Sequence, residues 1–341
     1  MEHSINVQLD HLDTIPDGLL TVSATDLHTL LPRPTLINLP GKHPEPLFVS
    51  VLLHGNETTG LLAIQQLLKC YQSQSLPRCL SIFFGNIDAA KLGLRRLDGQ
   101  VDYNRTWPGT PLSPCPETVI MQDVVDIMKQ KSVFASIDVH NNTGLNPHYA
   151  CVNKLDDAFL QLATLFGRFV VYFTRPQGVQ SSAFADICPA VTLECGRPGQ
   201  QYGVEHAVEF LNSALHLDHF PQQPVHHQDI DLYHTVAQVK IKPEVAFSFS
   251  DPQADLLLDP DLEKLNFTDV NTHTIIGRWN SDQPIPVQAM DENGHDVSGR
   301  FFEIIEQQLV ISRATMPSML TLDERVIKQD CLCYLMERLA I

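Results

Sequence analysis

The chain has 341 residues, of which 43% are hydrophobic and 18% charged, the proportions of a globular protein with a sizeable core. This length exceeds the usual size of a single domain, so we expect one large and one small domain. The formal net charge of −17 argues against binding nucleic acid or an anionic membrane through general electrostatics. An anionic substrate is still compatible with it, because a metal and a few arginines can form a local positive site.

The cysteines and the apolar runs indicate the compartment. The eight cysteines show no disulfide-like or zinc-finger spacing, and no Cys-x-x-Cys pair occurs. No apolar run reaches the ~18 residues of a membrane-spanning helix, and residues 1–9 lack a basic region followed by an apolar stretch. We therefore expect a cytoplasmic protein with no membrane partner. The sequence leaves the oligomeric state open.

The N-terminal half is expected to alternate strands and helices. Residues 1–46, which contain six prolines, should form a small strand or two and one short helix near residues 23–30. Further strands are expected at 47–53, 79–84, 133–139, 169–173 and 190–193, and helices at 59–71, 117–129, 156–166 and 204–217. Apolar strands that alternate with amphipathic helices predict an α/β fold, a mostly parallel mixed sheet covered by helices.

The pattern changes near Pro221, where residues 220–229 have the composition of a linker. Beyond it, short strands are expected at 233–241, 245–248, 274–277, 287–290, 309–312 and 331–335. We therefore expect an N-terminal extension of the catalytic domain (1–46), the catalytic domain itself (47–220) and a smaller β-rich C-terminal domain (221–341).

His54 and Glu57 lie on the expected turn between the strand at 47–53 and the helix that follows. In a parallel sheet this turn falls at the carboxyl edge, where ligands bind. An imidazole and a carboxylate three residues apart can hold one cation, although His-x-x-Glu by itself is more often a solvated loop.

Three further polar stretches lie at strand ends or in adjoining loops. Residues 96–109 form a polar loop with two arginines. Asp138 and His140 point to the same side of a strand by its period of two, and the strand at 190–193 ends on Glu194.

A catalytic zinc site takes three protein ligands and keeps one position open. His54, Glu57 and His140 supply two imidazoles and a carboxylate, and Asp138 can orient a ligand from outside the metal shell. Glu194 is then the natural carboxylate to take a proton from water and hand it to the leaving nitrogen.

The arginines of the polar loop suit an anionic substrate. Arg105, with Asn104, can hold a substrate carboxylate through a two-pronged contact. Arg96 can steady the oxyanion formed at the attacked carbonyl, and Arg95 beside it is a rival for that role.

Taken together and in this order, four stretches resemble the zinc carboxypeptidase superfamily, and within it the succinylglutamate desuccinylase/aspartoacylase branch. These stretches are HGNE (54–57), R-x-D-G-x-x-D-x-N-R-x-x-P-G (96–109), DVHN (138–141) and LECG (193–196). The resemblance covers roughly residues 47–215. It implies a zinc-dependent hydrolase with an α/β domain and a smaller C-terminal β domain.

The resemblance also implies roles for individual residues. It assigns one zinc ion per chain to His54, Glu57 and His140, and the general base and acid work to Glu194. It further implies that Asn104 and Arg105 hold the substrate's carboxylate and that Arg96 lies near the scissile carbonyl.

The chain departs from the branch at a few positions. Tyr103 and Trp107 stand where leucine and phenylalanine are more usual. Aspartoacylases also carry an arginine shortly before the catalytic glutamate, and residues 181–186 contain none. This argues against a dicarboxylate like N-acetylaspartate, unless Arg175 or Arg197 takes that place.

The favoured function is therefore the hydrolysis of a linear amide, in which the acyl group of a small N-acyl amino acid is removed. One alternative is a metallocarboxypeptidase that acts on a short peptide. A second alternative, of another class, is a metal-binding sensor without catalytic activity. The sequence identifies neither the acyl group nor the amino acid.

Overall fold

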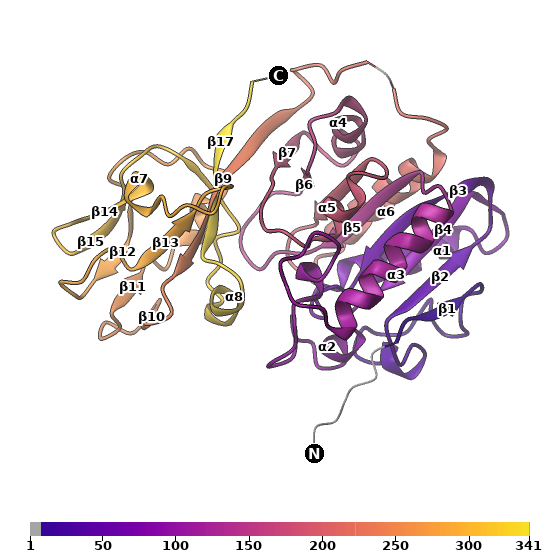
Figure 1. Cartoon of the computed structure of the whole chain (residues 1–341), viewed down its shortest axis with the longest axis horizontal. Helices are drawn as coiled ribbons and strands as arrows, with labels where there is room; N and C mark the ends of the chain where they lie inside the picture. Colours follow the sequence, from indigo (N-terminus) through magenta and orange to yellow (C-terminus); the bar gives the residue numbers. More distant parts are fainter. Residues whose placement is uncertain (1–7, 222, 341) are drawn as a thin grey trace. The chain divides into compact units, whose positions relative to one another are not determined.

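The computed structural model describes residues 8–221 and 223–340 of the chain. The described residues divide into two compact units. The first comprises the residues up to Asn141 together with His148–Tyr172 and Pro176–Asp231, and the second comprises Asn142–Pro147, Phe173–Arg175 and the residues from Leu232 onward. The first unit is a mixed, mostly parallel sheet with helices, and the second contains a separate β-rich sheet, which confirms the predicted fold class (Figure 1).

The sheet of the first unit has the strand order β1-β2-β4-β3-β5-β8-β6-β7. Its strands are β1 (Asp10–Leu12), β2 (Thr35–Leu39), β3 (Gly41–Val51), β4 (Leu76–Phe84), β5 (Ala135–His140), β6 (Tyr149–Val152), β7 (Phe169–Tyr172) and β8 (Ala190–Glu194). The central strands β4, β3, β5 and β8 are mutually parallel, whereas β2 is antiparallel to β4 and β6 to β8.

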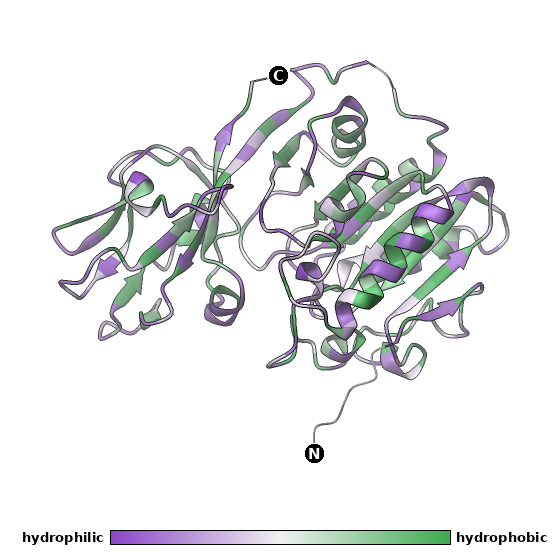
Figure 2. Ribbon diagram, viewed as in Figure 1, coloured by the Kyte–Doolittle hydropathy of each residue, from purple (hydrophilic) through white to green (hydrophobic). Residues whose placement is uncertain are grey.

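Helices join these strands, and their apolar sides face the protein interior. They are α1 (Thr59–Cys70), α2 (Ile87–Lys91), α3 (Pro116–Gln130), α4 (Asp157–Thr164), α5 (Gln180–Phe184) and α6 (Gln201–His216), with 3-10 turns at Leu27–Thr29 and Tyr103–Arg105. Helices α1 and α6 pack against each other. Helix α3 shows its hydrophilic side outward in Figure 2, while Ile120, Val124 and Met128 on its other side are buried.

The parallel strands bring their carboxyl ends to one edge of the sheet. β3, β5 and β8 are neighbours in this order, so the residues that follow or end them meet in space. The strand expected at 47–53 ends at Val51, because Leu52 adopts a left-handed conformation with φ of 57°. This conformation is uncommon for a residue with a side chain, and it turns the chain two residues before His54.

The second unit is built from two groups of strands around one apolar core. Strand β9 (Asp231–Ile241) pairs with β13 (Val287–Met290) and with β17 (Cys333–Arg338), and β17 pairs with β16 (Met316–Ser318). A five-stranded sheet has the order β10 (Phe247–Ser248), β11 (Leu256–Leu258), β12 (Ile275–Trp279), β15 (Gln308–Ile311), β14 (Phe302–Ile305). The 3-10 turn Leu262–Leu265 and the helices α7 (Ser298–Phe301) and α8 (Glu324–Gln329) complete this unit. Trp279, Phe301 and Leu332 are among the buried side chains of its core.

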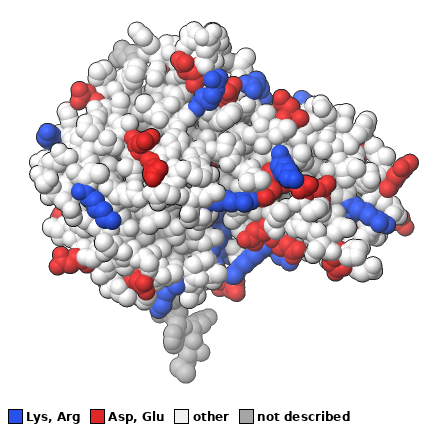
Figure 3. All heavy atoms as spheres, turned by 180° about the vertical axis from the view of Figure 1, so that it is seen from behind, with Lys and Arg blue, Asp and Glu red and all other residues white. Residues whose placement is uncertain are grey.

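The predicted helices α1, α3, α4 and α6 are present, with ends that differ by at most three residues. The sequence analysis missed β6 and the short helices α2 and α5, because runs of four or five residues carry almost no periodic signal. On the face shown in Figure 3, lysine and arginine side chains lie among aspartates and glutamates. Among the described residues, no helix has the length and apolar character to cross a membrane.

Gly55, directly after His54, should be required for a close packing contact. A methyl group there would lie 2.1 Å from the backbone nitrogen of Ala90 in α2, a distance that no relaxation of a side chain can relieve. We expect Gly55→Ala to lower the free energy of unfolding by about 1–3 kcal/mol, as overpacking does. Gly299→Ala is the control, because its new methyl group would meet no atom within 4 Å. Urea unfolding of both variants is the measurement, and equal stabilities would contradict the prediction.

Candidate metal and catalytic site

His54, Glu57 and His140 form a buried cluster at the carboxyl edge of the first unit's sheet. His54 and Glu57 lie on the turn between β3 and α1, and His140 is the last residue of β5. One ligand atom from each of the three lies within 4.8 Å of the others. Their exposed fractions are 3, 6 and 4%, so the cluster is shielded from bulk water.

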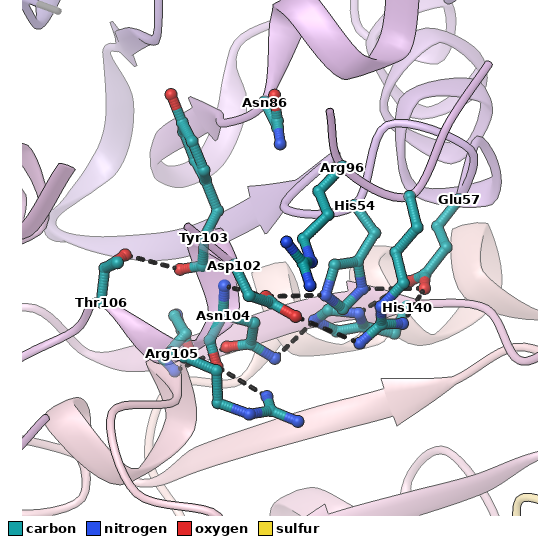
Figure 4. A network of polar contacts seen from close by, with 12 residues as sticks. His54, Glu57, Asn86, Arg96, Asp102, Tyr103, Asn104, Arg105, Thr106 and His140 are labelled. Atoms are coloured by element: carbon teal, nitrogen blue, oxygen red, sulfur yellow. Dashed lines mark hydrogen bonds and ion pairs between the residues drawn. The ribbon is translucent and has the colours of Figure 1, made fainter. Parts of the chain in front are cut away.

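The Glu57 carboxylate lies between the two imidazoles. Its Oε1 is 2.8 Å from Nδ1 of His54, and its Oε2 is 2.7 Å from Nδ1 of His140 (Figure 4). The Nδ1 atoms of both histidines therefore point to one place, at the carboxylate that the sequence analysis grouped with them.

The outer nitrogen of each histidine meets a second carboxylate. Nε2 of His54 lies 3.1 Å from Oδ1 of Asp102, and Nε2 of His140 lies 2.7 Å from Oδ2 of Asp138. Such outer carboxylates fix the orientation of a ligand histidine and the nitrogen that faces the metal. Asp138 occupies the place that its spacing from His140 predicted, and it also accepts a hydrogen bond of 2.6 Å from the Ser50 hydroxyl on β3.

Asp102 is a site residue that the sequence analysis missed. It belongs to the quoted motif but lies 48 residues from His54, and no local spacing connects the two. Its Oδ1 also accepts a hydrogen bond from the backbone nitrogen of Asn104, which fixes the 3-10 turn that carries Asn104 and Arg105.

The electrostatics favour charged forms throughout the cluster. Burial would raise the pKa of Glu57, but His54 and His140 outweigh it and hold this pKa far below its usual range. Burial would lower the pKa of His140, but Asp138 and Glu57 raise it well above the usual value. Burial and Arg95 lower the pKa of His54, and Glu57 and Asp102 together still raise it.

The donor set fits a zinc ion. Two imidazoles and one carboxylate are ligands of catalytic zinc sites, and three protein ligands leave a position for water or substrate. The two Nδ1 atoms and the Glu57 oxygens converge, while both Nε2 atoms are occupied by carboxylates outside the cluster. His54, Glu57 and His140 can therefore hold a metal ion.

Glu194 ends β8 directly beside this cluster. Strands β5 and β8 are parallel and pair His140 with Glu194, and the backbone nitrogen of Cys195 donates to the His140 carbonyl at 3.0 Å. Glu194 is 5% exposed. His140 and Glu194 are thus the last residues of two neighbouring strands, although they are 54 positions apart in the sequence.

Asn104 and Arg105 lie next to the cluster on their 3-10 turn. The Asn104 side-chain nitrogen is 3.2 Å from Nε2 of His140, and its side-chain oxygen accepts from the backbone nitrogen of Gln180. Nη1 of Arg105 donates to the Asn104 carbonyl at 2.7 Å. Since Nε2 of His140 serves the closer and charged Asp138, the contact with Asn104 is a close approach that orients its amide towards the site.

Arg95 and Arg96 have different partners. Arg95 donates from Nη1 to Glu57 and from Nη2 to Asp102, both at 3.4 Å. Arg96 donates from Nη1 to the Gln100 carbonyl at 2.7 Å, and Figure 4 shows its side chain on the same side of the site as His54.

Arg175, one of the two arginines that could take the place of the missing substrate arginine, has a partner within its own unit. Its Nε donates to the Glu292 carbonyl at 2.6 Å, in the turn after β13. Arg197 is half-buried, one residue beyond Gly196.

Comparison with known proteins gives one family. The sequence profile described as "Succinylglutamate desuccinylase/Aspartoacylase catalytic domain" matches residues 46–217, half of the chain. No curated protein matches the sequence.

Solved structures of similar fold include three whose identity to the chain is low. Succinylglutamate desuccinylase from Chromobacterium violaceum is 15% identical, with a TM-score of 0.56 over 87% of this chain and 86% of that one. Succinylglutamate desuccinylase/aspartoacylase from Rhodobacter sphaeroides is 16% identical, with a TM-score of 0.57 over 89 and 88%. Murine aminoacylase 3 is 13% identical, with a TM-score of 0.57 over 88 and 97%. At these identities the likeness establishes the fold.

Asp102→Asn should weaken zinc binding, because it replaces the carboxylate behind His54 by a neutral amide. We expect the dissociation constant for zinc to rise by about 10- to 100-fold, the usual cost of losing such an outer carboxylate. Competition with a chromophoric chelator measures this constant. Asp126→Asn is the control, because Asp126 is an exposed residue of α3. Equal zinc affinity of the two variants would show that Asp102 does not support the metal ligand.

Proposed function

Because the chain belongs to the succinylglutamate desuccinylase/aspartoacylase family, we propose that it is a zinc-dependent hydrolase that cleaves the amide bond of an N-acyl amino acid. The observation that carries this proposal is the meeting of His54, Glu57 and His140 with Glu194 at one edge of the sheet. The names of similar structures, succinylglutamate desuccinylase and aminoacylase, support the choice of an N-acyl amino acid as the substrate class.

In this proposal His54, Glu57 and His140 hold one zinc ion per chain. When bound, zinc polarises a carbonyl and lowers the pKa of a water molecule towards neutrality. Asp102 and Asp138 keep the two imidazole rings in place by accepting from their outer nitrogens.

Glu194 would move the proton. The pairing of Glu194 with His140 across two neighbouring strands supports this role, and Glu194 is not one of the proposed metal ligands. It would take a proton from the attacking water and give that proton to the leaving nitrogen, the work of a general base and then of a general acid.

Arg105 would bind the free carboxylate of the amino acid, with the Asn104 amide next to it. Arg96 would stabilise the negative charge that develops on the attacked carbonyl oxygen. We assign this role to Arg96 because both terminal nitrogens of Arg95 already contact the carboxylates of Glu57 and Asp102.

The proposed function also bears on the domain boundaries and on the cellular compartment. We propose that residues 47–220 form the catalytic domain, with 1–46 as its extension and 221–341 as a separate β-rich domain. The cysteines are all free thiols, which supports a reducing, cytoplasmic environment for the enzyme.

Glu194→Gln should abolish turnover and leave zinc bound. The amide keeps the shape of the side chain but cannot accept the proton, so we expect kcat to fall by about 10³-fold while zinc content stays at one per chain. The assay is a panel of N-acetyl and N-succinyl amino acids, with zinc measured by atomic absorption. Glu209→Gln, an exposed position on α6, is the control.

The same panel, with dipeptides added, decides between classes of function. Turnover by Glu194→Gln at the parent rate would overturn its role. Faster cleavage of dipeptides than of N-acyl amino acids would indicate a carboxypeptidase instead. If the zinc-loaded parent cleaved none of these amides, the alternative of a metal-binding sensor without catalytic activity would be favoured.

Arg95 and Arg96 should give different kinetic effects. We expect Arg96→Met to lower kcat by about 10²-fold with little change in KM, as the loss of an oxyanion donor does. We expect Arg95→Met chiefly to weaken zinc binding, because Arg95 contacts Glu57 and the carboxylate behind His54. Steady-state kinetics at saturating zinc separates the two. If Arg95→Met lost kcat and Arg96→Met did not, the roles would be reversed.

A further inference from the structure

Asn141 connects three stretches of the chain that are far apart in the sequence. Its backbone nitrogen donates to Oε2 of Glu57 at 3.1 Å. Its side-chain nitrogen donates to the Gly196 carbonyl at 2.8 Å and to the Thr59 hydroxyl at 2.9 Å. Its side-chain oxygen accepts from the backbone nitrogen of Thr59 at 3.2 Å. The residue therefore joins the metal-ligand turn, the end of β5 and the segment just beyond Glu194.

These contacts use the backbone nitrogen, the side-chain oxygen and the side-chain nitrogen, which donates twice. Asn141 is 5% exposed, so water cannot replace a lost partner. The side chain needs an acceptor towards the first backbone nitrogen of α1 and a donor towards the Gly196 carbonyl. Among side chains of this size only an amide offers the two on separate atoms, a donor nitrogen and an acceptor oxygen.

The segment beyond Glu194 is confined from its other side as well. Gly196 has a φ of 71°, and a methyl group on it would lie 3.0 Å from Nε2 of His148. The Gly196 peptide is thus held between His148 and the amide of Asn141, two positions after Glu194.

We propose that Asn141 is a positioning residue that holds Glu194 in register with the metal ligands. Its donated bond to Gly196 fixes the chain directly after Glu194, while its backbone bond to Glu57 fixes the distance to the ligand cluster. This inference rests on the proposed function for its catalytic meaning, because Glu194 must act on a water at the metal. Its structural content, the restraint on residues 194–196, is independent of that function.

A merely structural role would consist of capping α1 through Thr59. The two roles depend on different atoms of the same side chain, so they can be separated. Asn141→Asp keeps the oxygen that accepts from the Thr59 nitrogen, but it places a second oxygen against the Gly196 carbonyl, where no proton is available. Asn141→Ala removes both contacts.

Zinc binding should survive in the aspartate variant. The backbone nitrogen that contacts Glu57 is retained, and an added negative charge next to the ligands does not repel a cation. A loss of kcat in Asn141→Asp would therefore not be a loss of metal. Asn212→Asp is the matched control, because Asn212 lies on α6 and its side-chain oxygen, which the aspartate retains, accepts from the Tyr71 hydroxyl at 2.6 Å.

The experiment measures kcat, KM and the zinc dissociation constant of the three variants at pH 8, about four units above the ordinary pKa of an aspartate. We expect kcat of Asn141→Asp and Asn141→Ala to fall by about 10- to 100-fold, the scale of misplacing a reacting group by about 1 Å. KM and the zinc dissociation constant should stay within about threefold of the parent's values, which is small beside the expected loss of kcat. Asn212→Asp should match the parent. An unchanged kcat in Asn141→Asp, or a loss that excess zinc restores, would overturn the proposal.

Amide hydrogen exchange gives a second readout that needs no substrate. In the zinc-loaded protein, peptides that cover residues 194–203 should exchange faster in Asn141→Asp than in the parent and in Asn212→Asp. Equal exchange would overturn the positioning role even in an active enzyme. If the parent cleaved no amide, the proposed function would fail, and the exchange data would still decide whether Asn141 holds this segment.

Discussion

A buried carboxylate between two imidazoles is the interaction on which the rest of the site depends. Glu57 is almost fully removed from water, and an ionised carboxylate in such a place requires close polar partners. His54 and His140 supply them, and each is in turn supported by a carboxylate, Asp102 or Asp138. The result is a row in which carboxylates and imidazoles alternate. Removal of any member would leave its neighbour buried and uncompensated, which explains why three separate stretches of the chain must meet with little freedom.

The sequence was sufficient for the parts of this arrangement that depend on local spacing and on strand ends. His54 and Glu57 are three residues apart, Asp138 and His140 are two apart on one strand, and Glu194 ends a predicted strand. Strand ends in a parallel sheet meet at one edge, so these residues could be grouped without coordinates. The family resemblance carried the assignment further, and the match over residues 46–217 confirms that resemblance.

The contacts between loops could not be predicted in the same way. Asp102 supports His54 across 48 positions, and Asn141 reaches Gly196 across 55. Loop conformation sets such pairs, and no periodicity reports it. The same holds for Leu52, whose left-handed backbone ends β3 earlier than its apolar run suggested. It also holds for Arg175, whose contact with the Glu292 carbonyl is invisible in the sequence.

The pairing of His140 with Glu194 across β5 and β8 limits where residues can be inserted into or deleted from the chain. One residue inserted into either strand would turn the side chains beyond it to the opposite face and separate the carboxylate from the imidazole. The connection between them, residues 141–189, contains β6 and β7, to which the same rule applies, whereas a partly exposed loop such as residues 153–156 can lengthen at little cost in free energy. Insertions and deletions that leave a working protein should therefore accumulate in such loops and spare the strands that they join.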